Sequence, residues 1–112
     1  YRRPGSEDAP YAGQPVMVSE YGGTWWREGQ VDDGSWGYGQ RPRSLEELLE
    51  RYRALTEALL QNPRVAGFCY TQLYDIEQEA NGLYTYTRKP KLDPEPVKRI
   101  NRQPAMIEET AT

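Results

Sequence analysis

The apolar residues of this chain are concentrated in three segments separated by polar stretches. Gln14–Glu20 is a short apolar run with the β-branched residues Val16 and Val18 at alternate positions, a pattern that predicts a buried strand. Arg64–Tyr70 is almost continuously apolar and predicts a second buried strand. Between these two runs, Ser44–Gln61 repeats its apolar residues with the period of an α-helix.

The helix predicted over Ser44–Gln61 has clear signals at both ends. Ser44 and Glu47 match a capping box, and Asn62-Pro63 ends the periodic segment. We expect seven residues on one face, which we interpret as a core face covering a sheet: Leu45, Leu48, Leu49, Tyr52, Leu55, Leu59 and Leu60.

The order strand, helix, strand predicts a right-handed βαβ unit with parallel strands, whose carboxyl ends lie on the same side of the sheet. A second helix is expected to begin with Asp93 as its N-cap and Pro94 as its first residue. We expect an irregular lead-in over residues 1–13 and a flexible tail over residues 103–112.

Composition and charge exclude several classes of function. The chain has 112 residues, enough for one small domain, and its net charge of −3 with scattered basic residues disfavours a nucleic-acid partner. No apolar run approaches the ~20 residues that span a bilayer, so no membrane partner is expected, and nothing in the chain indicates a cellular location. No signal peptide is recognised in it.

The residue types available for chemistry are few. The chain has no histidine, so acid–base catalysis would fall to carboxylates or tyrosines. Its single cysteine, Cys69, lies in an apolar run and is interpreted as a core residue. The acidic segment that begins at Asp75 departs from a calcium loop at its sixth position, Ala80, and at its twelfth, Tyr86, so we expect no metal and no other cofactor.

A catalytic candidate emerges where the first apolar run ends. Glu20 closes that run and is followed by Gly22 and Gly23, which allow close approach of the backbone. The glycine-rich segment 21–43 then contains all three tryptophans, and the chain has nine tyrosines but one phenylalanine. Aromatic residues with a polar rim suit sugar clefts and protein interfaces, so we expect this long segment to fold over a ligand.

The residues around Glu20 resemble a known family. Pro15–Gly23, with the sequence PVMVSEYGG, is similar to the strand-7 motif of the (β/α)8-barrel domain of family 2 glycoside hydrolases, the β-galactosidase and β-glucuronidase family. Two later segments, Gly67–Asp75 and Glu77–Leu83, resemble its strand-8 region, and Arg88–Pro94 resembles the entry to its last helix. The resemblance covers about residues 14–102 and implies an α/β fold: a C-terminal fragment of a (β/α)8 TIM barrel, about strands 7 and 8 with their helices.

The resemblance also implies an activity, the hydrolysis of O-glycosidic bonds with retention of configuration. It makes Glu20 the catalytic nucleophile and leads us to expect six substrate-binding residues: Tyr21, Trp25, Trp36, Thr71, Gln72 and Asp75. Thr71 stands where well-known members have a tryptophan, so their sugar preferences do not transfer.

The resemblance places the second carboxylate, the acid/base, upstream of the matched segment. The isolated chain is therefore expected to be an inactive fragment of a glycosidase, because a retaining mechanism needs two carboxylates. Its expected partners are a carbohydrate substrate, the remainder of the barrel and, through uncovered sheet edges, a second copy of itself.

Two readings from other classes remain open at this point. A non-catalytic carbohydrate-binding module would use Trp and Tyr platforms, although the strong helix at Ser44–Gln61 argues against it. A protein-interaction domain would instead expose the leucine face of that helix. Loss of turnover in a Glu20→Gln variant with sugar binding retained would distinguish a glycosidase from both.

Overall fold

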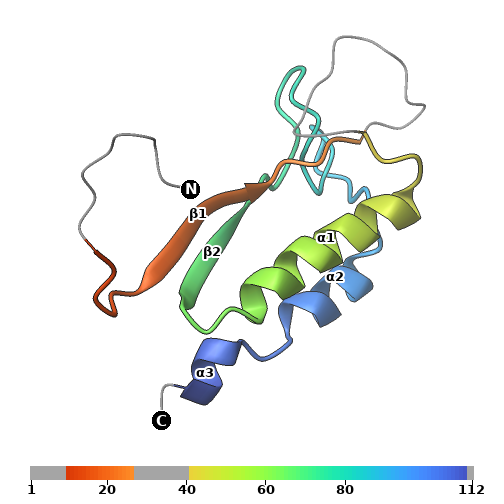
Figure 1. The fold of residues 1–112 in the computed structure, drawn as a ribbon. Helices are drawn as coiled ribbons and strands as arrows, with labels where there is room; N and C mark the ends of the chain where they lie inside the picture. The colour runs from red at the N-terminus through yellow and green to blue at the C-terminus, as the bar shows by residue number, and fades with distance from the viewer. Residues whose placement is uncertain (1–9, 27–40, 111–112) are drawn as a thin grey trace.

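The structure, a computed structural model, describes residues 10–26 and 41–110. Its elements follow the order β1 (Val16–Gly22), α1 (Leu45–Leu60), β2 (Val65–Thr71), α2 (Pro94–Asn101) and α3 (Met106–Thr110). The two strands lie side by side, and α1 and α2 run next to each other on one side of them (Figure 1). The expected strand, helix, strand order and the second helix are confirmed.

Strands β1 and β2 pair in parallel, as predicted from their connection through a helix. Val18 is the partner of Phe68, and the next partners are Tyr21 and Tyr70. Two residues of β1 therefore stand opposite one residue of β2 in this interval, which is the count of a β-bulge. Glu20 is one of the two residues in the bulge.

Helix α1 begins as predicted, with the Ser44 side chain accepting a hydrogen bond from the Glu47 main-chain N–H at 3.1 Å. Its buried residues are spaced four apart: Leu48, Tyr52, Thr56 and Leu60. Two leucines expected on this face, Leu45 and Leu55, are instead 40% and 41% exposed. The buried stripe is narrower than predicted, because steps of four residues exclude both positions and bring Thr56 into the core.

An aromatic core lies between the sheet and α1. Tyr70 is edge-on to Tyr52 of α1 with ring centroids 5.0 Å apart, and Tyr21 is edge-on to both Tyr70 and Phe68. The Tyr52 hydroxyl also donates to Asn101 Oδ1 at 2.6 Å, which ties α2 to α1. Helix α2 starts as expected, with the Asp93 side chain accepting from the Glu95 N–H.

The expected C-terminal fragment of a (β/α)8 barrel is wrong as a description of this fold. The described residues form a small α/β unit with one two-stranded parallel sheet (Figure 1). A barrel requires each strand to pair on both sides, with a tilt and stagger that close the sheet on itself. The βαβ pattern predicted the pairing correctly, but many α/β folds share that pattern and it does not encode closure.

Two further expectations differ from the structure. Cys69, interpreted as a core residue, is exposed on β2. Its neighbour Tyr70 packs against Tyr52 of α1, and successive side chains of a strand point to opposite faces. Helix α3 lies within the segment expected to be a flexible tail, and the Ala105 N–H donates to Glu108 Oε2 at 2.7 Å near its start.

Candidate functional site

The segments that follow β1 and β2 meet at the carboxyl edge of the sheet, as parallel pairing requires. The Gly23 N–H donates to the Thr71 carbonyl at 2.8 Å, and the Trp26 N–H donates to the Ala80 carbonyl at the same distance. These main-chain hydrogen bonds join two segments that the sequence separates by about half the chain. The loop after β1 and the loop after β2 are therefore hydrogen-bonded to each other at this edge.

Glu20 lies in β1 just before this edge, within the β-bulge, and its side chain is exposed. Bulges bend a strand and change the direction of its side chains, and they are common next to active sites. The structure thus places a carboxylate at the approach to the joined loops.

Tyr21, expected to bind substrate, contacts helix α1 through its hydroxyl group. Its hydroxyl is 3.0 Å from Thr56 Oγ1 on α1, so the ring points into the core between sheet and helix. In this position Tyr21 packs β1 against α1. The sequence places Tyr21 next to Glu20, but the bulge in β1 determines which face of the sheet the Tyr21 side chain occupies.

The buried tyrosines make stability sensitive to high pH. Burial raises the pKa of the Tyr21 hydroxyl above its ordinary value of 10.0, and burial also raises that of Tyr70, helped by nearby Tyr52. The unfolded chain therefore loses these protons first, so their contribution to stability is complete below about pH 10 and falls as pH rises further. We expect urea unfolding to show this alkaline decline, and Tyr70→Phe to reduce its slope; an unchanged slope in Tyr70→Phe would contradict the assignment.

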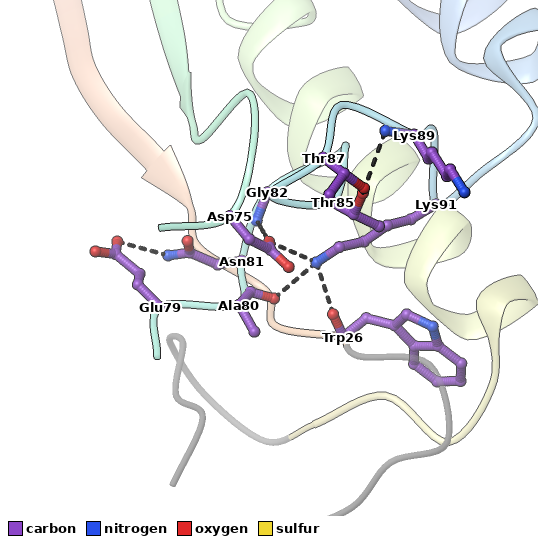
Figure 2. A network of polar contacts seen from close by, with 10 residues as sticks. All are labelled: Trp26, Asp75, Glu79, Ala80, Asn81, Gly82, Thr85, Thr87, Lys89 and Lys91. Carbon is purple, nitrogen blue, oxygen red and sulfur yellow. Dashed lines mark hydrogen bonds and ion pairs between the residues drawn. The ribbon is translucent and has the colours of Figure 1, made fainter. Parts of the chain in front are cut away.

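A buried lysine organises the joined loops (Figure 2). Lys91 Nζ donates to the Trp26 carbonyl at 2.6 Å, to Asp75 Oδ1 at 2.7 Å and to the Ala80 carbonyl at 3.0 Å. These bonds use the three donors of an ammonium group. The side chains of Lys91 and Asp75 are only 4% and 7% exposed, so the ion pair is shielded from water. We call the set Lys91, Asp75, Trp26 and Ala80 the lysine clamp.

Asp75 was expected to bind substrate, and the clamp gives it a different task. Its Oδ1 accepts from Lys91 and also from the Gly82 N–H at 2.9 Å. A carboxylate held in this way positions the loop and does not face an open cleft. The acidic segment that superficially matched a calcium loop is thus arranged around a lysine. Among residues 10–26 and 41–110, no group of three or more His, Cys, Asp or Glu side chains is placed to hold a metal ion.

Thr71 is the last residue of β2 and Gln72 the first of the loop that follows, and the peptide bond between them is cis. The Gln72 main chain pairs with that of Asn81, its N–H donating to the Asn81 carbonyl at 3.3 Å. Gln72 Nε2 and Asn81 Oδ1 are both buried without a hydrogen-bond partner in the protein. A buried donor and a buried acceptor without partners mark a place for a water or a ligand group.

Of the two tryptophans expected to bind substrate, one lies within the described residues. Trp25 is half-buried beside the lysine clamp, and the Arg41 guanidinium lies over its ring, 4.6 Å from the centroid. Trp36, expected to contact substrate, falls outside the described residues.

A groove of about 340 Å³ lies between the loop after β2 and helix α2. Its walls are mostly apolar and include Leu73, Tyr84 and Val97, whereas Glu20 and Gln72 are not among them. The groove is therefore separate from the carboxylate at the sheet edge.

Lys91 is the residue of this edge that sequence reasoning missed. Two of its three acceptors are main-chain carbonyls, which every residue carries, so no side chain identifies them in advance. The available signal was one pair of opposite charges in the same loop, Asp75 and Lys91.

Comparison of the chain with models of known protein families and with characterised proteins gives no match. Within the described part of the chain, no helix combines the length and apolar character needed to cross a bilayer.

Proposed function

We propose that this chain supplies the nucleophilic carboxylate, Glu20, and part of the sugar-contacting loops of a retaining glycoside hydrolase. The observation that carries the proposal is the position of Glu20. It is exposed in a β-bulge that leads directly to the carboxyl edge, where the segments after both strands are joined. The sequence motif around Glu20 supports the same role.

The retaining mechanism uses two carboxyl groups and needs no histidine. A carboxylate oxygen of Glu20 attacks the anomeric carbon of the sugar while the bond to the leaving oxygen breaks. A second carboxylic acid protonates the leaving oxygen and then, as a carboxylate, removes a proton from water. The water attacks the anomeric carbon and releases Glu20. Retaining enzymes hold these two groups about 5–5.5 Å apart, and the proposal assigns the second to a residue outside this chain.

The lysine clamp fits this proposal as a positioning element. It fixes the loop after β1 to the loop after β2 through the Trp26 and Ala80 carbonyls. Trp25 directly precedes Trp26 of the clamp, and the Gln72 N–H donates to the carbonyl of Asn81, the residue after Ala80. An aromatic face and an amide are groups that recognise the apolar and hydroxyl surfaces of a sugar.

Covalent trapping tests the proposal directly. A fluorinated dinitrophenyl glycoside loses dinitrophenolate without acid assistance, and its fluorine slows hydrolysis of the sugar ester that forms on the nucleophile. The probe is applied, as gluco, galacto and manno forms, to a protein that contains this chain with its acid/base partner. We expect a sugar adduct on the peptide that contains Glu20, located by mass spectrometry.

Each alternative result has a defined meaning. An adduct on another carboxylate, such as Glu77 or Glu79, would show that Glu20 is not the nucleophile. Reversible sugar binding without any adduct would favour the non-catalytic carbohydrate-binding reading. Preincubation with an unlabelled glycoside that is slowly turned over should protect Glu20, and a lack of protection would indicate nonspecific esterification.

A further inference from the structure

Asn81 and Gly82 form the dipeptide in which asparagine deamidates most readily, because glycine has no side chain to shield its main-chain nitrogen. In this reaction the deprotonated nitrogen of Gly82 attacks Cγ of Asn81. Nδ2 takes up a proton from solvent and leaves as ammonia, and a succinimide ring forms. Water then adds to either ring carbonyl and opens the ring, giving aspartate or isoaspartate at position 81.

The fold requires glycine at position 82, the residue that makes Asn81 prone to deamidation. A Cβ atom at residue 82 would lie 2.4 Å from the carbonyl carbon of Tyr74 and 2.6 Å from the nitrogen of Asp75. Both atoms belong to the main chain, so no side-chain movement relieves the contact. The close approach of the two backbone segments therefore leaves room for no residue larger than glycine after Asn81.

The same structure removes each requirement of the reaction. The Gly82 N–H donates to Asp75 Oδ1 at 2.9 Å, and a hydrogen bond to a carboxylate opposes loss of that proton. Asn81 is 0% exposed, and its Nδ2 donates to Glu79 Oε1 at 3.1 Å, which restrains the leaving group. Lys91 in turn holds Asp75 Oδ1 at 2.7 Å, so the clamp fixes the acceptor of the attacking nitrogen (Figure 2).

We propose that Asn81–Gly82 is a latent deamidation site, which the buried Asp75–Lys91 ion pair keeps unreactive as long as the lysine clamp is closed. Modification at Asn81 then accumulates with the time that the loops spend open. The modification also opposes reclosure of the loops. The new carboxylate would replace an amide that donates to Glu79, and a buried carboxylate facing another carboxylate disfavours reclosure.

The experiment compares the native chain, the Lys91→Met variant and the Lys89→Met variant in mildly alkaline buffer. Lys89 is exposed and two residues away, so Lys89→Met makes the same change of charge outside the clamp. Guanidinium-unfolded wild-type protein gives the unprotected rate. Peptide mapping measures the mass change at Asn81, and methylation by an isoaspartyl methyltransferase detects isoaspartate. Asn62 is an internal control, because Pro63 has no N–H and cannot attack it.

We expect the unfolded chain to deamidate at Asn81 roughly a hundredfold faster than the native chain. The folded Lys91→Met variant should deamidate at least about tenfold faster than the native wild-type chain. Lys89→Met should stay within about twofold of wild type. Equal rates in the native and unfolded wild-type chain would overturn the proposal, and so would a folded Lys91→Met variant with the wild-type rate.

A second measurement applies if Lys91→Met does not fold. Wild-type protein is then incubated in urea below its unfolding midpoint, and the Asn81 rate is compared with the global unfolding constant. A rate that depends less steeply on urea than global unfolding indicates that the clamp opens locally, as proposed. An identical dependence would show that only global unfolding exposes Asn81. None of these readouts involves a sugar, so the proposal stands or falls independently of the glycosidase function.

Discussion

Replacing Glu20 by glutamine is expected to lower the turnover of an aryl glycoside by a factor on the order of 10⁴ or more. Glutamine has the same shape as glutamate but cannot form the sugar ester, so the first chemical step loses its nucleophile. Sugar binding should be retained, because the bulge that presents position 20 is formed by the main chain. The measurement is steady-state kinetics in a protein that contains the chain with its acid/base partner.

A matched control and a chemical rescue make this result specific. Glu95→Gln alters another exposed glutamate, in the first turn of α2, and should leave turnover within about twofold of wild type. In Glu20→Ala, added azide should enter the space of the missing carboxylate and attack the anomeric carbon, giving a glycosyl azide of inverted configuration. Unchanged turnover in Glu20→Gln, or azide products of retained configuration, would disprove the nucleophile assignment.

Replacing Lys91 by methionine is expected to lower the free energy of unfolding by about 3–5 kcal/mol, the usual cost of removing one partner from a buried ion pair. Methionine keeps most of the side-chain length but has no donors. The Asp75 carboxylate, 7% exposed, would keep its Gly82 hydrogen bond and lose its counter-charge. Two main-chain carbonyls, of Trp26 and Ala80, would also lose a donor. Urea unfolding at neutral pH measures the loss.

Lys89→Met is the control for the loss of one positive charge. Lys89→Met changes the charge by the same amount on an exposed side chain and should alter the free energy of unfolding by less than about 0.5 kcal/mol. In the double variant with Asp75→Asn, part of the loss should be recovered, because no uncompensated buried carboxylate remains. Equal destabilisation by Lys91→Met and Lys89→Met would show that the clamp does not stabilise the fold.

The regular elements of this chain were predictable because each depends on residues close in sequence. The capping box at Ser44 and the Asp93-Pro94 pair determine where α1 and α2 begin. The apolar runs predicted β1 and β2, and a helical connection makes their parallel pairing the expected one. The barrel was wrong because closure of a sheet depends on strands far apart in a chain, and two strands with their loops do not determine it.

The candidate site was predictable only in part. A carboxylate at the end of the first apolar run could be read from the sequence, and Glu20 lies in the β1 bulge, two residues before the strand ends. The positions of Tyr21 and Asp75 could not, since the bulge in β1 sets one and the partner Lys91 sets the other. A bulge adds a residue without changing the apolar pattern that predicts the strand, and a tertiary ion pair has no fixed spacing.

The long reach of the clamp has a consequence for the order of events in folding. The hydrogen bond from Lys91 to the Trp26 carbonyl joins residues 65 positions apart, and the whole of α1 and β2 lies between them. Closing so long a segment is entropically costly until the intervening strand and helix have packed and brought its ends together. We therefore expect the clamp to form after the folding transition state. Interactions of that kind slow unfolding and leave the folding rate almost unchanged, so the candidate site owes its lifetime to contacts that form last.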